Sequence, residues 1–374
     1  MTELNENFPE NSSESSPLPS SSTFNEAINV TENSSQQTTN ADSIQKRSTR
    51  SQSRYQKRLE QGEEDDKKWE GPPWKNLPHV ALVNVFKFLP EDDRLEAQFV
   101  CRRWYDLIRN TPCIWRVKYF KFSGRNKRDL THSPYRFATH FIKNFGHFIK
   151  KLEFRLYSPI SSSVCKKFQK SIKVSLNQLT KVECKLEELS LPLLQLDRSH
   201  WAQHREEMCS SLAKFFKNSK GNLQRVYLRG ARVNEDEGFN IINSLGCNAG
   251  NTVDQLDIED FYNCGRPVYQ QTKFSSCFKY FNRLYELDIN YSYISNKLLD
   301  TLSDSLKFGS LKYMYIKVSP HEERCQLIRP QSWRRLKDEC PKLKVKLMFL
   351  RVMTYSDHYR ILCPEIPLNQ VMKT

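Results

Sequence analysis

The histidines of the segment HWAQH are the residue pair whose spacing comes nearest to a catalytic metal site. His200 and His204 stand four positions apart, which would place both imidazoles on one face of a helix. A zinc-protease helix of this kind carries a glutamate directly after the first histidine as its general base, and Trp201 takes that position here. No third ligand is suggested, and the neighbouring Glu206 and Glu207 favour an ordinary solvated helix face.

Other catalytic patterns do not stand out in the sequence. The chain has 11 glycines but no glycine-rich phosphate loop, and it has neither a GxSxG elbow nor a Cys–His signature. Its 11 cysteines include no CxxC pair, which argues against both a zinc site and a secreted disulfide framework. We therefore expect no catalytic residue, no metal and no cofactor, and a protein that is not itself an enzyme.

The stretch from Trp74 to Phe122 predicts three short helices. Pro78 suits a first helical turn, because its fixed φ fits there and its missing N–H would have no partner. Pro90 ends this helix, and the acidic residues after it favour a second one, since the helix dipole stabilises negative charge at an N-terminus. A third helix ends before Pro112. The apolar side chains exceed what three short helices can bury among themselves, which predicts a docking module.

These residues resemble the F-box family, whose pattern fixes many residue types over this length. The resemblance implies a three-helix module that inserts an apolar face into the Skp adaptor, which in turn sits on a cullin scaffold. The residues expected at the adaptor are Leu77, Pro78, Leu82, Val85, Phe86, Leu89, Leu95, Val100, Trp104 and Trp115. A buried helical bundle inside a larger domain is the alternative interpretation.

A second pattern follows and repeats along the chain. The spacing L-x-x-L-x-L recurs at a drifting interval in residues 149–154, 186–191, 223–228, 253–258, 284–289, 311–316 and, more weakly, 340–345. Each segment predicts a short parallel strand with its leucines pointing inward, and the stretches between the segments show helical spacing of apolar residues. The predicted fold is α/β, an irregular leucine-rich-repeat-like solenoid. The alternative is a general α/β domain with coincidental runs.

The expected domain organisation has three parts. Residues 1–70 form a disordered tail, because they hold too few large apolar residues to offset the entropy of ordering. Residues 71–121 form the F-box, and residues 122–374 form a linker and the solenoid, with residues 122–130 read as a turn and a basic linker. Proteins that the chain resembles continue with more repeats, so we expect a shortened C-terminus, from a shorter isoform or an incomplete gene model.

The setting is expected to be intracellular, in the cytoplasm, the nucleus or both. The N-terminus is polar and acidic where a secretory signal would be basic and then apolar, and no apolar run is long enough to cross a membrane. A basic cluster at Lys46–Arg58 is consistent with a nuclear localisation signal, although short basic runs are common in tails.

An F-box followed by leucine-rich repeats resembles the substrate-recognition subunits of Skp-cullin-F-box (SCF) ubiquitin ligases. In such a subunit the repeats would bind an as yet unknown protein substrate through the outward residues of their strands, on the concave face. The residues expected there are Tyr227, Arg229, Asp257, Glu259, Asp288, Asn290, Tyr315 and Lys317. This face should be acidic in the middle and basic or aromatic at its ends, which suits a ligand with a basic centre flanked by acidic or phosphorylated positions.

A basic nucleic-acid-binding repeat protein is the alternative function. The net charge of +15 attracts acidic partners, and aromatic residues alternate with basic ones in Leu311–Val318 and Lys273–Leu287, as suits single-stranded nucleic acid. Acidic residues on the predicted concave face would repel a uniformly anionic ligand. A protein ligand is therefore favoured, and no membrane partner is expected.

Overall fold

The computed structural model describes residues 77–123, 134–157, 161–219, 221–263, 272–306, 309–319, 328–349 and 366–373. The chain divides into two units, Met1–Leu77 and Pro78–Thr374, and nearly all described residues belong to the second. The predicted tail at residues 1–70 and the basic cluster Lys46–Arg58 lie outside the described residues.

Three helices open the second unit, as the sequence predicts. They are α2 (His79–Phe88), α3 (Glu91–Ala97) and α4 (Arg102–Asn110), followed by the 3-10 helix η2 (Pro112–Ile114). Pro78 and Pro90 each stand immediately before a helix, where a proline ring removes no helical hydrogen bond. The first turn of α3 is wholly acidic, which complements its dipole.

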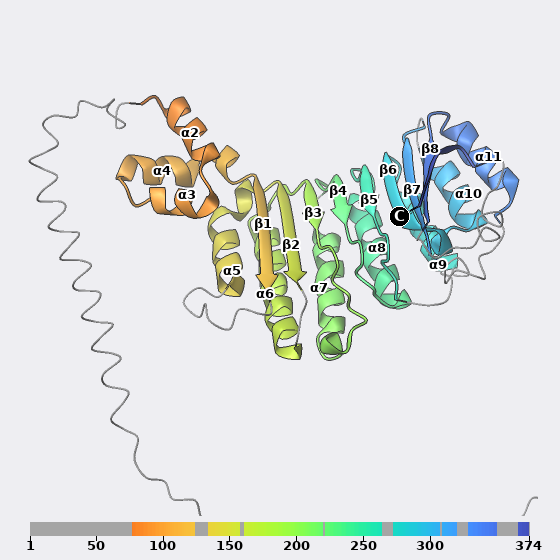
Figure 1. Ribbon diagram of the computed structural model, residues 1–374, viewed down its shortest axis with the longest axis horizontal. Helices are drawn as coiled ribbons and strands as arrows, with labels where there is room; N and C mark the ends of the chain where they lie inside the picture. The colour runs from red at the N-terminus through yellow and green to blue at the C-terminus, as the bar shows by residue number, and fades with distance from the viewer. Residues whose placement is uncertain are drawn as a thin grey trace, which may run out of the picture. The chain divides into compact units, whose positions relative to one another are not determined.

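In the described residues, nine strands form one parallel sheet in chain order (Figure 1). They are β1 (Val117–Ser123), β2 (Lys151–Tyr157), β3 (Glu188–Ser190), β4 (Arg225–Tyr227), β5 (Gln255–Asp257), β6 (Glu286–Asn290), β7 (Tyr313–Val318), β8 (Lys344–Phe349) and β9 (Leu368–Lys373). The second apolar position of the first six predicted repeats falls in one register row across β2 to β7, made of Leu152, Leu189, Val226, Leu256, Leu287 and Met314. β8 continues the row with Val345, which is the third apolar position of the weak seventh repeat, so that repeat is shifted by two residues. All members of this row are buried, so the repeat prediction is confirmed.

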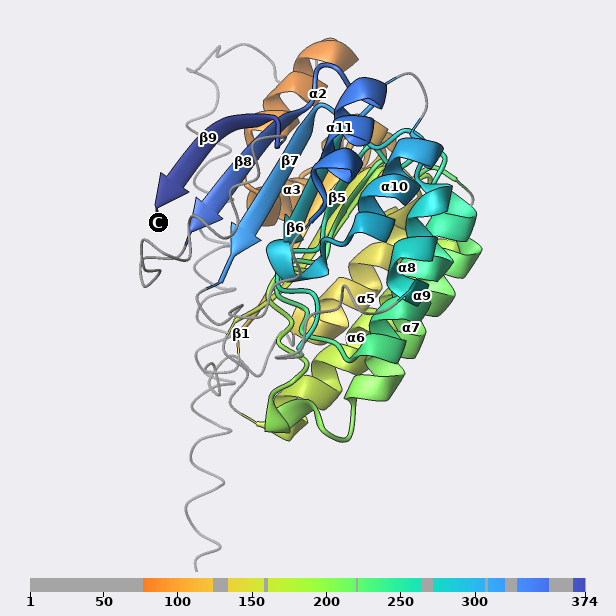
Figure 2. The same cartoon turned by 90° about the vertical axis from the view of Figure 1, so that its right-hand side faces the viewer.

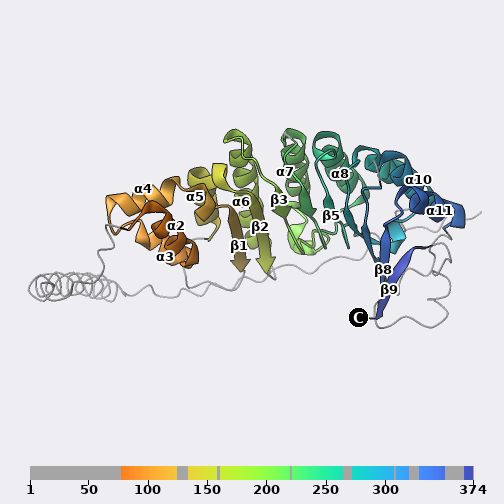
Figure 3. The same ribbon diagram turned by 90° about the horizontal axis from the view of Figure 1, so that it is seen from above.

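Helices cover one face of this sheet (Figures 2 and 3). They are α5 (Pro134–Phe145), α6 (Ser162–Lys181), α7 (Arg205–Asn218), α8 (Glu235–Ala249), α9 (Thr272–Cys277), α10 (Asn296–Ser305) and α11 (Pro330–Glu339), with the 3-10 helices η3 (Gly146–Phe148), η4 (Ser199–Trp201), η6 (Phe278–Tyr280) and η7 (Tyr291–Tyr293). The core lies between the two layers. The opposite face of the sheet, free of helices in these views, is called the open face below.

Two strands were not predicted from the sequence. β1 includes Phe122 and Ser123, which were expected to begin a turn and linker, and the rest of that predicted linker, residues 124–130, lies outside the described residues. In β1 the inward row holds Lys118, in register with Leu152, so the leucine pattern is broken at this strand. β9 likewise carries no L-x-x-L-x-L spacing and pairs with β8 through an irregular register.

No helix among the described residues is both long enough and apolar enough to span a membrane.

Candidate functional site

Large apolar side chains stand exposed around the first three helices. They are Val80, Val85 and Phe88 on α2, with Phe99 and Val100 between α3 and α4, and we call them the N-terminal apolar surface. Phe88 is 89% exposed and Phe99 85% exposed. Rings this open to water are costly in a free protein, and exposed apolar patches commonly mark sites of protein association. This surface is therefore a candidate docking site.

The structure divides the predicted adaptor-binding residues into two sets. Leu82, Phe86 and Trp115 are buried within the chain, whereas Pro78, Val85 and Val100 are exposed, and Leu77, Leu89, Leu95 and Trp104 are half-buried. Phe86 packs edge-on against Trp104 with ring centroids 5.1 Å apart, and Trp115 Nε1 donates a hydrogen bond of 2.7 Å to the Ile108 carbonyl. In this conformation the buried members support the surface from beneath.

The exposed rings Phe88 and Phe99 are absent from the predicted set. The signal for Phe88 was present in the sequence, because α2 is apolar nearly all round and so cannot bury every side in a small bundle. Phe99 lies between α3 and α4, where helical spacing gives no signal. The predicted adaptor-binding residues of α2 follow one side of the helix, and Phe88 lies on another side.

A buried lysine joins these helices to the solenoid. Lys118 of β1 forms an ion pair with Glu91 of α3, and its amine lies 4.3 Å from the ring centroid of Phe141 and 4.6 Å from that of Phe120. Burial lowers the pKa of Lys118 to about 7. Arg94 of α3 holds η2 against the same helix, because its Nη1 donates to the Ile114 carbonyl at 2.7 Å.

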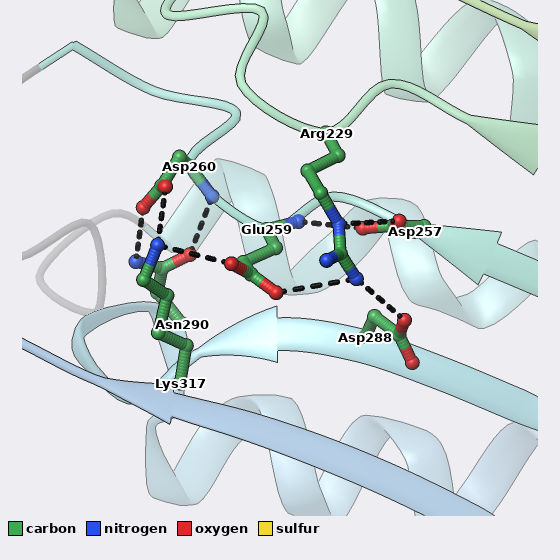
Figure 4. A network of polar contacts seen from close by, with 7 residues as sticks. All are labelled: Arg229, Asp257, Glu259, Asp260, Asp288, Asn290 and Lys317. Atoms are coloured by element: carbon green, nitrogen blue, oxygen red, sulfur yellow. Dashed lines mark hydrogen bonds and ion pairs between the residues drawn. The ribbon is translucent and has the colours of Figure 1, made fainter. Parts of the chain in front are cut away.

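Arg229 is the centre of a charge network on the open face (Figure 4). It lies two residues after the end of β4 and pairs with carboxylates from the next two repeats along the sheet. Its Nε lies 2.8 Å from Asp257 Oδ2, and its Nη2 lies 3.2 Å from Glu259 Oε2 and 3.1 Å from Asp288 Oδ2. One guanidinium therefore spans three strands, which suits its planar fork of donors.

Lys317 of β7 closes the other side of the network (Figure 4). Its Nζ lies 3.0 Å from Glu259 Oε1 and 2.6 Å from Asp260 Oδ2. Asn290 holds Asp260 in place, since Asn290 Nδ2 donates to Asp260 Oδ1 at 3.0 Å and the Asp260 N–H donates to Asn290 Oδ1 at 2.6 Å. Asp260 has a φ of +50°, a left-handed conformation that these contacts help to stabilise.

Carboxylates outnumber cations in this network. The pKa of Asp288 is raised to about 7, first by burial and then by the neighbouring carboxylates Asp257 and Glu286, while Arg229 lowers it by less. Burial also raises the pKa of Asp257. Burial opposes ionisation of Asp260 as well, but hydrogen bonds from Lys317 and Asn290 outweigh it and lower the pKa of Asp260.

All eight predicted substrate-binding residues lie on the open face, six of them within the network. The other two, Tyr227 and Tyr315, share one register row with Asp257 and Asp288. The expected charge distribution needs correction, because Arg229 is paired with buried acids and does not form a separate basic end. Lys317 is paired in the same way. Asp260 was missed, since it follows β5 in a turn where strand alternation says nothing.

The predicted histidine pair does not share a helix. His200 lies in η4 and His204 precedes α7, with its Nε2 3.3 Å from Ser162 Oγ. The chain turns between them, so the helix face inferred from their spacing was wrong. In the part of the chain that the structure describes, no group of three or more His, Cys, Asp or Glu side chains is placed to hold a metal ion.

Comparison with known proteins agrees with this arrangement. Residues 74–121 match the F-box-like family. The chain is 24% identical to F-box/LRR-repeat protein 21 of Mus musculus over 286 residues, 25% identical to that of Ovis aries over 280 residues and 27% identical to that of Bos taurus over 288 residues. Each alignment covers 74% of this chain and 59% of the relative, so the chain spans well under two thirds of the length of these relatives. The chain thus combines an F-box-like region with a parallel-stranded solenoid, and it is similar to F-box/LRR-repeat proteins.

Proposed function

We propose that this protein is a substrate-recognition subunit of an SCF ubiquitin ligase and has no catalysis of its own. The F-box-like region would bind the Skp adaptor, and through it a cullin scaffold, while the open face binds a protein substrate. The observation that carries the proposal is the match of residues 74–121 to the F-box-like family, on helices that expose Phe88 and Phe99.

The exposed apolar area supports association with an adaptor. Burying a Phe or Val side chain that was exposed contributes about 1.5–3 kcal/mol. Phe88, Phe99 and Val100 together would supply about 4.5–9 kcal/mol, which offsets much of the cost of association, and the rest of the contact has to supply the net affinity. Pro78 and Val85, the exposed members of the predicted adaptor set, would extend the contact.

A non-catalytic subunit of this kind accelerates ubiquitin transfer by positioning. Holding the substrate beside a ubiquitin-charged enzyme raises the effective concentration of its lysines. Such positioning needs a firm connection between the two binding regions. The ion pair of Lys118 in β1 with Glu91 in α3 is consistent with a connection of that kind.

We also propose a more specific relationship for this protein and a class of substrate. The segments FSGR at Phe122–Arg125 and LDINYSYIS at Leu287–Ser295 resemble F-box only protein thirty-nine. An intracellular location is part of the same proposal. The mixed charges and tyrosines of the open face favour a protein ligand, because Tyr and Arg are the residues most often found at interface hot spots.

Adaptor capture by matched variants tests the proposal. The full chain should co-purify with the adaptor, and Phe88→Ser combined with Phe99→Ser should reduce capture at least tenfold. Val174→Ser combined with Leu193→Ser removes exposed apolar side chains from outside the F-box-like region and should leave capture unchanged. Equal capture by all three proteins would contradict the docking assignment.

A further inference from the structure

Positive charge is concentrated on the outer side of two neighbouring helices, α5 and α6. Neither helix contains an Asp or a Glu residue. Their cationic residues are Arg136, Lys143, Lys166, Lys167, Lys170, Lys173 and Lys181, and every one of them is exposed. We call this set the basic helical surface.

These cations are largely without counter-charges. Within the described residues, the ion pair formed by this set is that of Lys173 with Glu207 of α7, at 2.5 Å. Lys166, Lys167 and Lys170 form no ion pair with any described residue. An ordinary solvated helix carries both signs of charge, and its i,i+4 pairs offset each other. A one-sign surface of this extent creates a field that favours an anionic partner.

The arrangement of the charges is regular. Lys166, Lys170 and Lys173 follow one another at i, i+4 and i+7, so they lie along one side of α6 over about 10 Å. Arg136 and Lys143 of α5 have the same i, i+7 relation. The two helices pack side by side, and Ser171 Oγ of α6 donates to the Tyr135 carbonyl of α5 at 3.1 Å. α5 and α6 are neighbours in the helical layer (Figure 1), so the cations of both helices belong to that layer.

The side chains of the basic helical surface favour one kind of polyanion over the others. A membrane surface would call for apolar side chains that insert among lipids, and Val174 is the exposed large apolar residue on α5 and α6. Single-stranded nucleic acid would call for exposed aromatic rings on which bases stack, and the aromatic residues of these two helices are buried or half-buried. Lysine and arginine rows without either feature suit the regularly spaced phosphates of a duplex.

We propose that the basic helical surface binds the phosphate backbone of double-stranded nucleic acid without reading its sequence. This goes beyond the proposed ligase function, because it uses the helical layer and leaves the open face of the sheet available (Figure 2). Asp257, Glu259 and Asp288, the acids expected to repel nucleic acid, all lie on the open face (Figure 4). They do not line the helical side of the sheet.

The experiment measures binding of the full chain, purified with any captured adaptor, to a short labelled duplex at several salt concentrations. Neutralising each phosphate contact should reduce the slope of log Kobs against log salt by about 0.9. The variant Lys166→Gln, Lys167→Gln, Lys170→Gln should therefore lower the slope by about 2 to 3 and weaken binding at about 50 mM salt at least tenfold. Gln has nearly the helix propensity of Lys, so the fold should be unaffected.

The matched control is Lys297→Gln, Lys337→Gln, Lys342→Gln, which removes the same charge from exposed sites on other elements. It should bind the duplex like the parent, and the tail with Lys46–Arg58 is identical in all these proteins.

A second variant, Arg136→Gln with Lys143→Gln, should lower the slope by about 2 and guards against a folding defect in α6. Absence of duplex binding by the parent, equal losses in test and control variants, or preferential binding to vesicles of anionic lipid would each overturn the proposal.

Discussion

Lys118 and Glu91 form an ion pair that connects the first strand of the sheet to α3 of the F-box-like region. Lys118 stands in register with Leu152, in the inward row that the strands β2 to β8 fill with aliphatic residues or methionine. The side chain is 4% exposed. The solenoid thus begins with a buried cation at the place where it meets the preceding helices.

Replacing Lys118 by Met should preserve the fold and change its pH dependence. Burial lowers the pKa of Lys118 from 10.5 to about 7, so the unfolded chain binds more protons between these values. The stability of the parent should therefore rise as the pH increases from about 7 toward 10.5, as the buried charge is lost. Lys118→Met should lack this rise, and its cost at pH 7 should be small, because the Glu91 carboxylate that it leaves without a counter-charge is 32% exposed and can be hydrated.

Denaturant unfolding of parent and Lys118→Met at several pH values provides the measurement. Lys121→Met, on the same strand but exposed, is the control and should keep the parental pH dependence. Parallel stability curves for the parent and Lys118→Met would contradict the burial of a titrating amine.

Asp288 should give the opposite pH dependence. Its pKa is raised from 3.8 to about 7, so the folded state binds the extra proton between these values and stability should fall as the pH rises through them. Asp288→Asn stays neutral and still offers Arg229 an acceptor, and its stability should vary less from about pH 4 to pH 7. Thermal unfolding across this range measures the effect. Asp304→Asn, at an exposed carboxylate, should behave like the parent.

The tyrosines of the open face provide a cleaner test of substrate binding than the charges do. Reversing the charges of Arg229 and Lys317 would leave Asp257 and Glu259 buried without counter-charges and would disturb the fold. Tyr227→Ala with Tyr315→Ala should reduce substrate capture about thirtyfold, in line with a loss of about 2 kcal/mol or more at a hot spot. Adaptor capture should be unchanged.

Comparison of captured proteins by quantitative mass spectrometry, with the cullin pathway inhibited, measures this effect. Tyr119→Ala, an exposed tyrosine on β1 at the other end of the sheet, is the control. If the double tyrosine variant retained the same partners at the same yield, the open face would not be the selecting surface.

Gly238 of α8 should not tolerate a methyl group. A Cβ at this position would overlap Cε1 of Tyr262 and meet Phe261 at 3.0 Å. Gly→Ala inside a helix ordinarily stabilises by about 1 kcal/mol, whereas overpacking costs about 1–3 kcal/mol. We expect Gly238→Ala to destabilise the protein, as measured by denaturant unfolding. Stabilisation by that substitution would show that α8 and the Tyr262 turn are less closely packed than described.

The sequence predicted those parts of the fold where one rule repeats. The L-x-x-L-x-L spacing located β2 to β8, because each strand buries alternate residues against the same helical layer. It could not locate β1, where Lys118 interrupts the apolar row and is stabilised by Glu91, a residue distant in sequence. Such a compensation is visible only once both elements are placed.

The candidate sites were predictable to a similar degree. Strand alternation placed Arg229, Asp257 and Asp288 on one face, but it could not show that they pair with each other. Asp260 enters the network from a turn with positive φ, which alternation does not describe. Near the N-terminus, the apolar residues of α2 were recognised, but which of them are exposed depends on packing against α4.

The central claim is tested most directly by titrating the purified full chain with purified Skp adaptor in a calorimeter. The account predicts a one-to-one complex with a Kd of about 1 μM or tighter and a negative heat-capacity change, the mark of apolar burial. Phe88→Ser with Phe99→Ser should weaken that complex at least tenfold, and Val174→Ser with Leu193→Ser should not. A folded parent protein that gave no binding heat at any temperature tested, and no complex by size-exclusion chromatography, would contradict the account.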